Sequence, residues 1–204
     1  MYKPSHFKKE EPEYVLQFIR EHPFATFVLQ GERLLATHIP VLTKGSADDF
    51  LLFGHVAVHN PQRECLKDGM EVLLIFQGPD AYISSSWYSR PDISTWDYSA
   101  VHINARLKIQ TEEELRESLK ALVAHFEARQ VEPLHYDDLP KEILKTHLPK
   151  ITGFWLYPTQ VEAIAKLSQN KSATDVASVV AHLKQQTCCP AQSELIHQIK
   201  KEND

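Results

Sequence analysis

The stretch AVHINARLKI, residues 100–109, is the clearest strand of the sequence and decides the fold class. Apolar residues occupy every second position from Val101 onward, which is the pattern of a strand with one buried face. Upstream, EVLLIFQ at residues 71–77 is a continuous apolar run, typical of a strand buried on both faces. We expect Gly78–Pro79 to end that strand and AYISSS, residues 81–86, to start another.

The other strands and helices follow from the same spacing rules. Strands are predicted at residues 24–30, 33–42 and 49–56, with a final strand or hairpin at residues 151–167. Helices are predicted at residues 10–22, 60–69, 112–128, 139–148, 172–186 and 195–200. The strands thus precede the first long helix in hairpin-length steps. This order favours an antiparallel sheet or small barrel with peripheral helices, a mainly β (α+β) fold, over alternating βαβ units.

The composition limits the cellular setting and the class of partner. The chain has 204 residues, 43% of them hydrophobic, and a formal net charge of -5. This acidic balance argues against direct DNA binding, because nucleic-acid-binding domains are usually basic. Cys65, Cys188 and Cys189 are odd in number and two are adjacent, which argues against a secreted disulfide framework. Since no apolar run approaches a membrane span, we expect a reduced, cytoplasmic protein without a membrane partner.

Several catalytic and metal signatures are absent from the sequence. The six glycines form neither GxGxxG nor GxxxxGK[ST], and no GxSxG, CxxC or HExxH occurs. No metal site is therefore predicted. The sequence also identifies no catalytic residue, and it leaves open whether the protein is an enzyme.

The segment 78–102 concentrates aromatic and hydroxyl side chains outside any regular hydrophobic period. Such side chains stack on flat ligands and hydrogen-bond their edges, or they form an aromatic-rich interface. Ser84 and Ser86 share one side of an extended segment, where their hydroxyls could bond a phosphate or a ring carbonyl. The aromatic candidates are Trp87, Trp96 and Tyr98. A packing role is the alternative for each ring.

Two further segments carry polar groups suited to a phosphate. In KLSQNK, residues 166–171, lysines could neutralise a phosphate and an amide could read a ring edge, whereas a solvated linker is the alternative. HVAVHNP, residues 55–61, leads into a helix N-terminus, whose free N–H groups can hold a phosphate. Structural hydrogen bonding and helix capping are the alternatives there. The candidates in these segments are Lys166, Ser168, Asn170, Lys171, His55 and Asn60.

Taken in order, these segments resemble the PaiB-like family of FMN-binding negative transcriptional regulators. The resemblance runs nearly end to end, through MYKPSHF, ATHIPVL, LLFGHVAVHNP, EVLLIFQGPDAYISSSWY, STWDYSAVHI and KLSQNK. It implies a split β-barrel related to the pyridoxamine-phosphate-oxidase-like flavoproteins, formed by residues 1–165, with residues 166–204 as a helical appendage packed on it. It also implies a homodimer that holds FMN near the subunit interface.

The chain departs from the family pattern at four positions. Val58 replaces the basic residue of HxARxNP, and Ser85 replaces the proline of YISPSWY. Asp97 replaces the asparagine of TWNY, and Ala105 replaces a frequent glycine. Val58 matters most, because an arginine–phosphate contact is worth roughly 1.5–3 kcal/mol, and its loss would weaken FMN binding about tenfold to a hundredfold. Weak or absent FMN binding, or the use of His59 or a lysine instead, stays open.

Three functions follow from the resemblance and the composition. The first is an FMN-binding split-barrel regulator with an indirect regulatory role, in which Lys166 and Lys171 balance the phosphate charge and Trp96 or Tyr98 covers the ring. The second is a flavin-dependent oxidoreductase of the pyridoxamine-phosphate-oxidase-like class, since FMN itself carries hydride chemistry. The third is a repressor that binds DNA directly, which the acidic charge and the absence of a clear helix-turn-helix disfavour.

Overall fold

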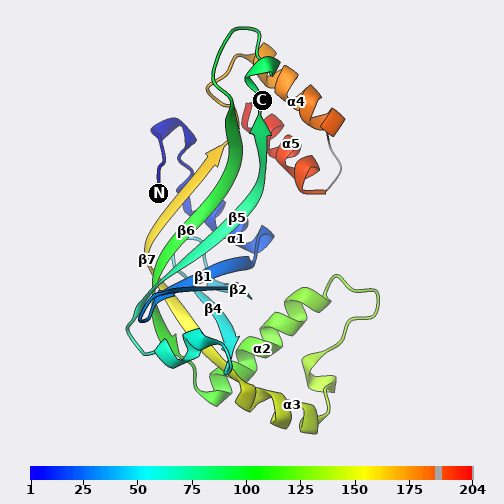
Figure 1. Ribbon diagram of the computed structural model, residues 1–204. Coiled ribbons are helices and arrows are strands. Elements are labelled where there is room, and N and C mark those ends of the chain that lie inside the picture. The colour runs from blue at the N-terminus through cyan, green and yellow to red at the C-terminus, as the bar shows by residue number, and fades with distance from the viewer. Residues whose placement is uncertain (187–189, 204) are drawn as a thin grey trace. The chain divides into compact units, whose positions relative to one another are not determined.

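Figure 1 shows the computed structural model, which describes residues 1–186 and 190–203. Within these residues seven strands form one sheet in the order β2-β1-β5-β6-β7-β4-β3. The strands are β1 (Phe24–Gln30), β2 (Leu34–Pro40), β3 (Leu42–Gly45), β4 (Phe50–Ala57), β5 (Glu71–Ile83), β6 (Thr95–Ile109) and β7 (Ile151–Lys166). The helices are α1 (Pro12–Glu21), α2 (Glu112–Glu127), α3 (Lys141–His147), α4 (Ala173–Gln186) and α5 (Pro190–Asn203). Short 3-10 turns are η1 (Ser5–Phe7), η2 (Pro61–Cys65), η3 (Ser85–Trp87), η4 (Tyr136–Asp138) and η5 (Leu148–Lys150).

The sheet is antiparallel at the pairs β1–β2, β1–β5, β3–β4 and β4–β7. In the first of these pairs Phe24 lies opposite Pro40, and the two strands are joined by a tight turn, as in any hairpin. The predicted mainly β fold with peripheral helices is therefore confirmed. The prediction about Cys188 and Cys189 falls on residues that the structure does not describe. Cys65 lies in the described part of the chain and is a free thiol.

The prediction that Gly78–Pro79 ends a strand is wrong, because β5 continues to Ile83. The reason lies in the pairing of β5 with β1, which runs from Leu73 to Ile75 and so stops before the proline. Proline lacks an N–H, and it fits a strand where no neighbouring strand needs that donor. The run AYISSS is thus not a strand of its own: residues 81–83 end β5, and the three serines cap and begin η3.

Pro158 occupies an equivalent position in β7. The pairing of β7 with β4 ends at Leu156, two residues before the proline. The open choice between a final strand and a hairpin at residues 151–167 therefore resolves to one long strand.

Two other predictions change in detail. The predicted strand at residues 33–42 is interrupted at Val41, which separates β2 from the short strand β3. The predicted helix at residues 60–69 is the shorter 3-10 turn η2, whose first residue is a proline that Asn60 precedes as the cap.

The chain divides into two compact units, and each of the long strands β5, β6 and β7 has residues in both. Unit 1 comprises Met1–Phe18, Gln77–His102 and Glu162–Asp204, and unit 2 comprises Ile19–Phe76 and Ile103–Val161. The division into a barrel domain of residues 1–165 and an appendage of residues 166–204 stays a prediction.

In unit 1, α4 and α5 pack on each other beside the end of β5 and the start of β6 (Figure 1). Their apolar faces join the last residues of β5 and the end of β7 in one buried cluster. Its members include Ile83, Leu167, Val179, Leu183, Leu195 and Ile199. Each such side chain contributes about 1.5–3 kcal/mol when fully buried, so this cluster fixes the strand ends that carry the polar segments 84–94 and 166–171.

In unit 2, the core lies inside the sheet and under α2 (Figure 1). Phe27 and Phe154 stack with ring centroids 5.0 Å apart and are fully buried. On the other face, Leu122 of α2 packs against Phe53. Helix α2 begins as predicted, because the Thr111 side chain accepts the Glu114 N–H and Glu114 accepts the Thr111 N–H in a capping box.

Candidate functional site

An aromatic pair lies on the outer face of the β5–β6 ribbon in unit 1. Strand alternation turns Ala81, Ile83 and Asp97 inward, so Tyr82 and Trp96 point the other way. Their ring centroids are 6.1 Å apart in an edge-to-face arrangement, and the two residues are 49% and 53% exposed. We call this pair the aromatic face. A large aromatic surface left half in solvent is available for a flat ligand or a partner chain.

The serines that follow β5 form a small hydroxyl cluster. Ser84 caps η3 by accepting the Ser86 N–H, and the two hydroxyl oxygens are 2.8 Å apart. The Ser94 hydroxyl accepts the Ser85 N–H and so closes the loop back on itself. The Ser84 and Ser86 hydroxyls form an exposed pair, with lone pairs left for a ligand.

Trp87 has a packing role in the structure. Its ring stacks on His182 of α4 with centroids 5.0 Å apart, and its carbonyl accepts the Ser178 hydroxyl. Tyr98 is partly buried against a cluster that contains Phe7 and Ile164. Of the three aromatic residues predicted for the site, Trp96 therefore presents the most open ring.

A buried acid lies behind Trp96, on the inner face of β6. Asp97 is 1% exposed, and its Oδ2 accepts the Ser168 hydroxyl at 2.5 Å. Lys166 Nζ is 3.8 Å from Asp97 Oδ1, and it donates to the Trp96 carbonyl at 2.5 Å and to the Thr95 hydroxyl. No described residue hydrogen-bonds Asp97 Oδ1.

Burial dominates the electrostatics of this group. It raises the pKa of Asp97, and the Ser168 hydrogen bond and the Lys166 charge offset only part of the rise. It also lowers the pKa of Lys166, against the attraction of Asp97. Ser168 holds its hydroxyl in place at a φ of 61°, a left-handed conformation that is unusual for serine. Lys166, Asp97 and Ser168 thus form one structural triad.

Lys171 has a different acidic partner from Lys166. Its Nζ pairs with Asp92, an exposed acid of the 84–94 loop, and lies 4.5 Å from the centre of the Tyr88 ring. Burial and the negative charges of Asp97, Asp92 and Asp175 raise the pKa of Tyr88 to about 12. Tyr88 therefore stays neutral, and its ring can carry the lysine as a cation–π partner.

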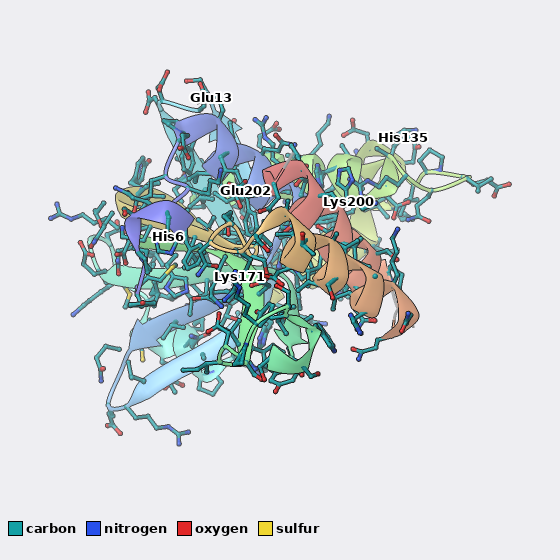
Figure 2. All side chains as sticks on the ribbon, turned by 90° about the horizontal axis from the view of Figure 1, so that it is seen from above. His6, Glu13, His135, Lys171, Lys200 and Glu202 are labelled. Atoms are coloured by element: carbon teal, nitrogen blue, oxygen red, sulfur yellow. The ribbon has the colours of Figure 1, made fainter. Side chains whose placement is uncertain are left out.

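The rest of KLSQNK connects β7 to α4. Gln169 donates to the Ala165 carbonyl at 2.5 Å and accepts the Leu167 N–H at 2.7 Å, so both ends of its amide serve the turn. Asn170 is exposed. Next to this turn, a cavity of about 780 Å³ lies against α4 and α5, and Figure 2 shows Lys171, Lys200 and Glu202 beside these helices.

The predicted site residues do not all lie in one unit. Nine of the eleven are in unit 1, whereas His55 and Asn60 belong to unit 2. Asn60 accepts the Gln62 N–H at 2.9 Å and so has the capping role that its sequence position allows. Burial lowers the pKa of His55, and no described residue hydrogen-bonds its Nδ1. Val58 donates its backbone N–H to the Lys150 carbonyl.

Sequence reasoning missed Tyr82, Asp92 and His182 as neighbours of the predicted residues. Tyr82 could have been found by extending the alternation of β5 through Pro79, which pairs it with Trp96 across the ribbon. Asp92 contacts Lys171, which is 79 residues away, and His182 contacts Trp87, which is 95 residues away. No local sequence pattern predicts contacts over such separations. Metal-ligating side chains form no cluster in the described part of the chain, and none of its helices is long and apolar enough to span a bilayer.

Comparison with known proteins places the chain in a family. Residues 1–160 match the family described as "Putative FMN-binding domain". The chain is 36% identical over 184 residues to "Protease synthase and sporulation protein PAI 2" of Bacillus subtilis, covering 90% of this chain and 89% of that protein.

Solved structures share the fold at low sequence identity. The FAD and heme binding protein from Mycobacterium smegmatis gives a TM-score of 0.59 at 14% identity, covering 84% of this chain and 79% of that one. The flavocytochrome Anf3 from Azotobacter vinelandii gives 0.55 at 14% identity, covering 84% and 73%. The family match supports FMN as the cofactor, whereas these structures show the shared fold. The chain therefore belongs to the PaiB-like family of FMN-binding proteins and has its split β-barrel fold.

Proposed function

We propose that this protein binds FMN on unit 1, with the isoalloxazine ring on the aromatic face and the phosphate at Lys171, and that it acts as a cytoplasmic homodimer with an indirect role in regulation. The observation that carries the proposal is the half-exposed Trp96–Tyr82 pair beside two lysines. The family match supplies the identity of the ligand.

The residues of unit 1 fit the chemistry of FMN. The ring needs an apolar face, which Trp96 offers, and hydrogen-bonding groups along one edge, which the Ser84 and Ser86 hydroxyls offer. The phosphate needs a cation that can change its partner. Lys171 meets this need, because its partner Asp92 is a half-exposed loop acid, and a pair with such an acid gains little free energy and can exchange the acid for a phosphate.

Lys166 has a different place in this proposal. Its ammonium already meets the Thr95 hydroxyl, the Trp96 carbonyl and Asp97. We assign it to holding the Trp96 backbone, so that the ring is presented at a fixed angle. When bound, FMN supplies a redox centre for hydride or single-electron transfer, and the protein positions and shields it.

Three further observations support the remaining parts of the proposal. Cys65 is a free thiol, as expected in a reducing compartment. Phe24 and Leu34 of β1 and β2 are 65% and 71% exposed, which suits a face covered by a second copy. The net charge of -5 favours an indirect regulatory role over direct contact with DNA.

The test is an FMN titration of flavin-free protein, followed by quenching of flavin fluorescence. Trp96→Leu should weaken binding about threefold to tenfold, since a ring contact contributes roughly 0.5–1.5 kcal/mol beyond its buried area. Lys171→Gln should weaken it about tenfold, because it removes one charge-assisted contact to phosphate. Tyr157→Leu and Lys184→Gln are matched controls with the same loss of ring or charge elsewhere, and they should bind FMN as the unchanged protein does.

Two results would overturn the proposal: no FMN binding by the unchanged protein, or equal FMN affinities for Trp96→Leu, Lys171→Gln and both controls. Sedimentation velocity tests the dimer separately, and a single species of the mass of one chain would contradict it. Reduction of the bound FMN by NADH or NADPH, with turnover of an acceptor, would add an oxidoreductase activity to the binding function.

A further inference from the structure

A second cavity, which lies wholly in unit 2, combines a charged rim with an apolar floor. Its volume is about 480 Å³, within the usual range of small-molecule sites. The start of α2, the end of α3, η2, η5 and the first residues of β7 surround it. We call it the α2 cavity. Its lining residues are Arg63, Ile109, Gln110, Thr111, Glu112 and Leu115, together with Arg116, Lys145, Leu148, Pro149, Ile151, Thr152 and Gly153.

The rim is positively charged although the whole chain is acidic. Three cations and one acid line the cavity. Arg116 pairs with Glu112 at 2.6 Å, and Lys145 pairs with Glu142 at 3.0 Å, both within one helix. Such exposed pairs within a helix contribute little to stability, so either cation can turn to an incoming anion. Arg63 forms no ion pair with any residue that the structure describes, and it is therefore the cation most free to bind.

The floor is apolar except for one amide. Leu115 and Leu148 are buried, and Gln110 packs directly on Gly153, where a Cβ would lie 2.2 Å from Gln110 Oε1. Gln110 is 9% exposed, and its Nε2 donates to the Ser118 hydroxyl at 2.7 Å. Its Oε1 has no hydrogen-bond donor among the described residues. An unsatisfied buried acceptor costs free energy, and a ligand donor would remove that cost.

His55 lies next to this floor. It is directly opposite Gly153 in the β4–β7 register, so its side chain stands on the face of the sheet that Gln110 and Leu115 cover. Its Nδ1 is likewise buried without a partner among the described residues. Two unsatisfied polar atoms thus lie on the face of the sheet that borders the floor of the cavity.

The geometry points to a binding site for a small organic anion in the α2 cavity, separate from the aromatic face and not assigned by the family. The carboxylate or phosphate of such a ligand would meet Arg63 and draw Arg116 from its acid. Its apolar body would cover Leu115 and Leu148, and a hydroxyl or N–H group of the ligand would donate to Gln110 Oε1. The site does not depend on the proposed flavin site.

The experiment uses full-length, FMN-loaded protein and follows backbone amide shifts by NMR as small probes are added. Phenyl phosphate and benzoate carry a charge and an apolar ring, benzyl alcohol carries the ring without the charge, and inorganic phosphate carries the charge without the ring. We expect the first two to shift the Gln110, Thr152 and Gly153 amides, with at least tenfold higher affinity than the last two. At least one of the three hydroxybenzoate isomers should bind severalfold tighter than benzoate, because its hydroxyl supplies the donor for Gln110.

The variant Arg63→Gln should weaken phenyl phosphate binding about tenfold, the loss of one charge-assisted contact, while Arg33→Gln on the exposed β1–β2 turn should leave it unchanged. Arg116→Gln provides a second test of the rim and should weaken binding by a smaller factor. The proposal is overturned if the amide shifts lie elsewhere, if charged and neutral probes bind equally, or if Arg63→Gln and Arg33→Gln behave alike. It is also overturned, as a separate site, if Arg63→Gln releases FMN.

Discussion

The two units use their charged side chains in opposite ways. In unit 1, Lys166 is enclosed by Asp97, the Thr95 hydroxyl and a backbone carbonyl, and its charge is matched by a buried acid. In unit 2, Arg63 lies at the rim of the α2 cavity without an acidic partner in the described part of the chain. A lysine in a conspicuous polar segment can thus be a structural element, whereas a lone surface arginine over an apolar floor is free to act on a ligand. Four predictions test this contrast.

The largest effect is expected from Asp97→Ala. It leaves Lys166 beside a cavity without its acid and Ser168 without its acceptor, so the free energy of unfolding should fall by about 3 kcal/mol in urea titrations. Asp97→Asn keeps the shape and the Ser168 hydrogen bond and should cost less than about 1 kcal/mol. Asp80→Ala, an exposed acid on the same ribbon, is the control. Equal stabilities of Asp97→Ala and Asp80→Ala would remove the structural role of the triad.

Ser168 provides the next effect, through two substitutions that separate its hydroxyl from its backbone. Ser168→Ala loses the hydrogen bond to Asp97 and keeps the left-handed strain, so we expect a loss of about 2 kcal/mol. Ser168→Gly loses the same bond but relaxes the backbone, so it should cost about 1 kcal/mol less than alanine. Urea unfolding measures both, and an alanine variant as stable as the glycine variant would contradict the strain.

The pH dependence of stability should reveal the buried charge of Asp97. Its pKa is raised in the folded state, so the folded protein holds this proton more tightly than the unfolded chain does. The contribution of Asp97 to stability is therefore greatest below its unfolded pKa and falls as the pH rises through the folded pKa. In urea unfolding from pH 4 upward, the unchanged protein should lose stability relative to Asp97→Asn as the pH rises. Parallel pH curves would mean that Asp97 is not desolvated.

The smallest effect on stability is expected from Arg63→Gln. Because this arginine has no partner to lose, the free energy of unfolding should stay within about 0.5 kcal/mol of the unchanged protein, although anion binding falls. Thermal unfolding without and with phenyl phosphate gives both values in one measurement. A large loss of stability without ligand would show that Arg63 is structural and would erase the contrast with Lys166.

The sequence predicted those parts of the fold that depend on local physics. The strand β1 from Phe24 to Gln30 and the capping box at Thr111 appear as expected, because alternation and capping act over a few residues. The continuation of β5 through Pro79 was not predictable in this way. Proline ends a strand only where a neighbour needs its N–H, and the extent of the β1–β5 pairing is a property of the whole sheet.

The candidate sites show the same limit. The aromatic face was predicted through Trp96, because its neighbours along the chain mark an unusual segment. The α2 cavity was not predicted, because Arg63, Gln110 and Gly153 come from segments about 40 residues or more apart and each looks ordinary in its own context. The sequence shows that Asp97 stands where the family pattern has asparagine, yet only the structure shows that this acid is buried against Lys166.

Pro158 has a consequence for how the chain behaves in a crowded solution. A strand edge without a β neighbour is a template on which another protein can form backbone hydrogen bonds. Pro158 is only partly buried, and it removes one N–H donor from such an edge in β7. Its ring thereby opposes fibril growth along this edge.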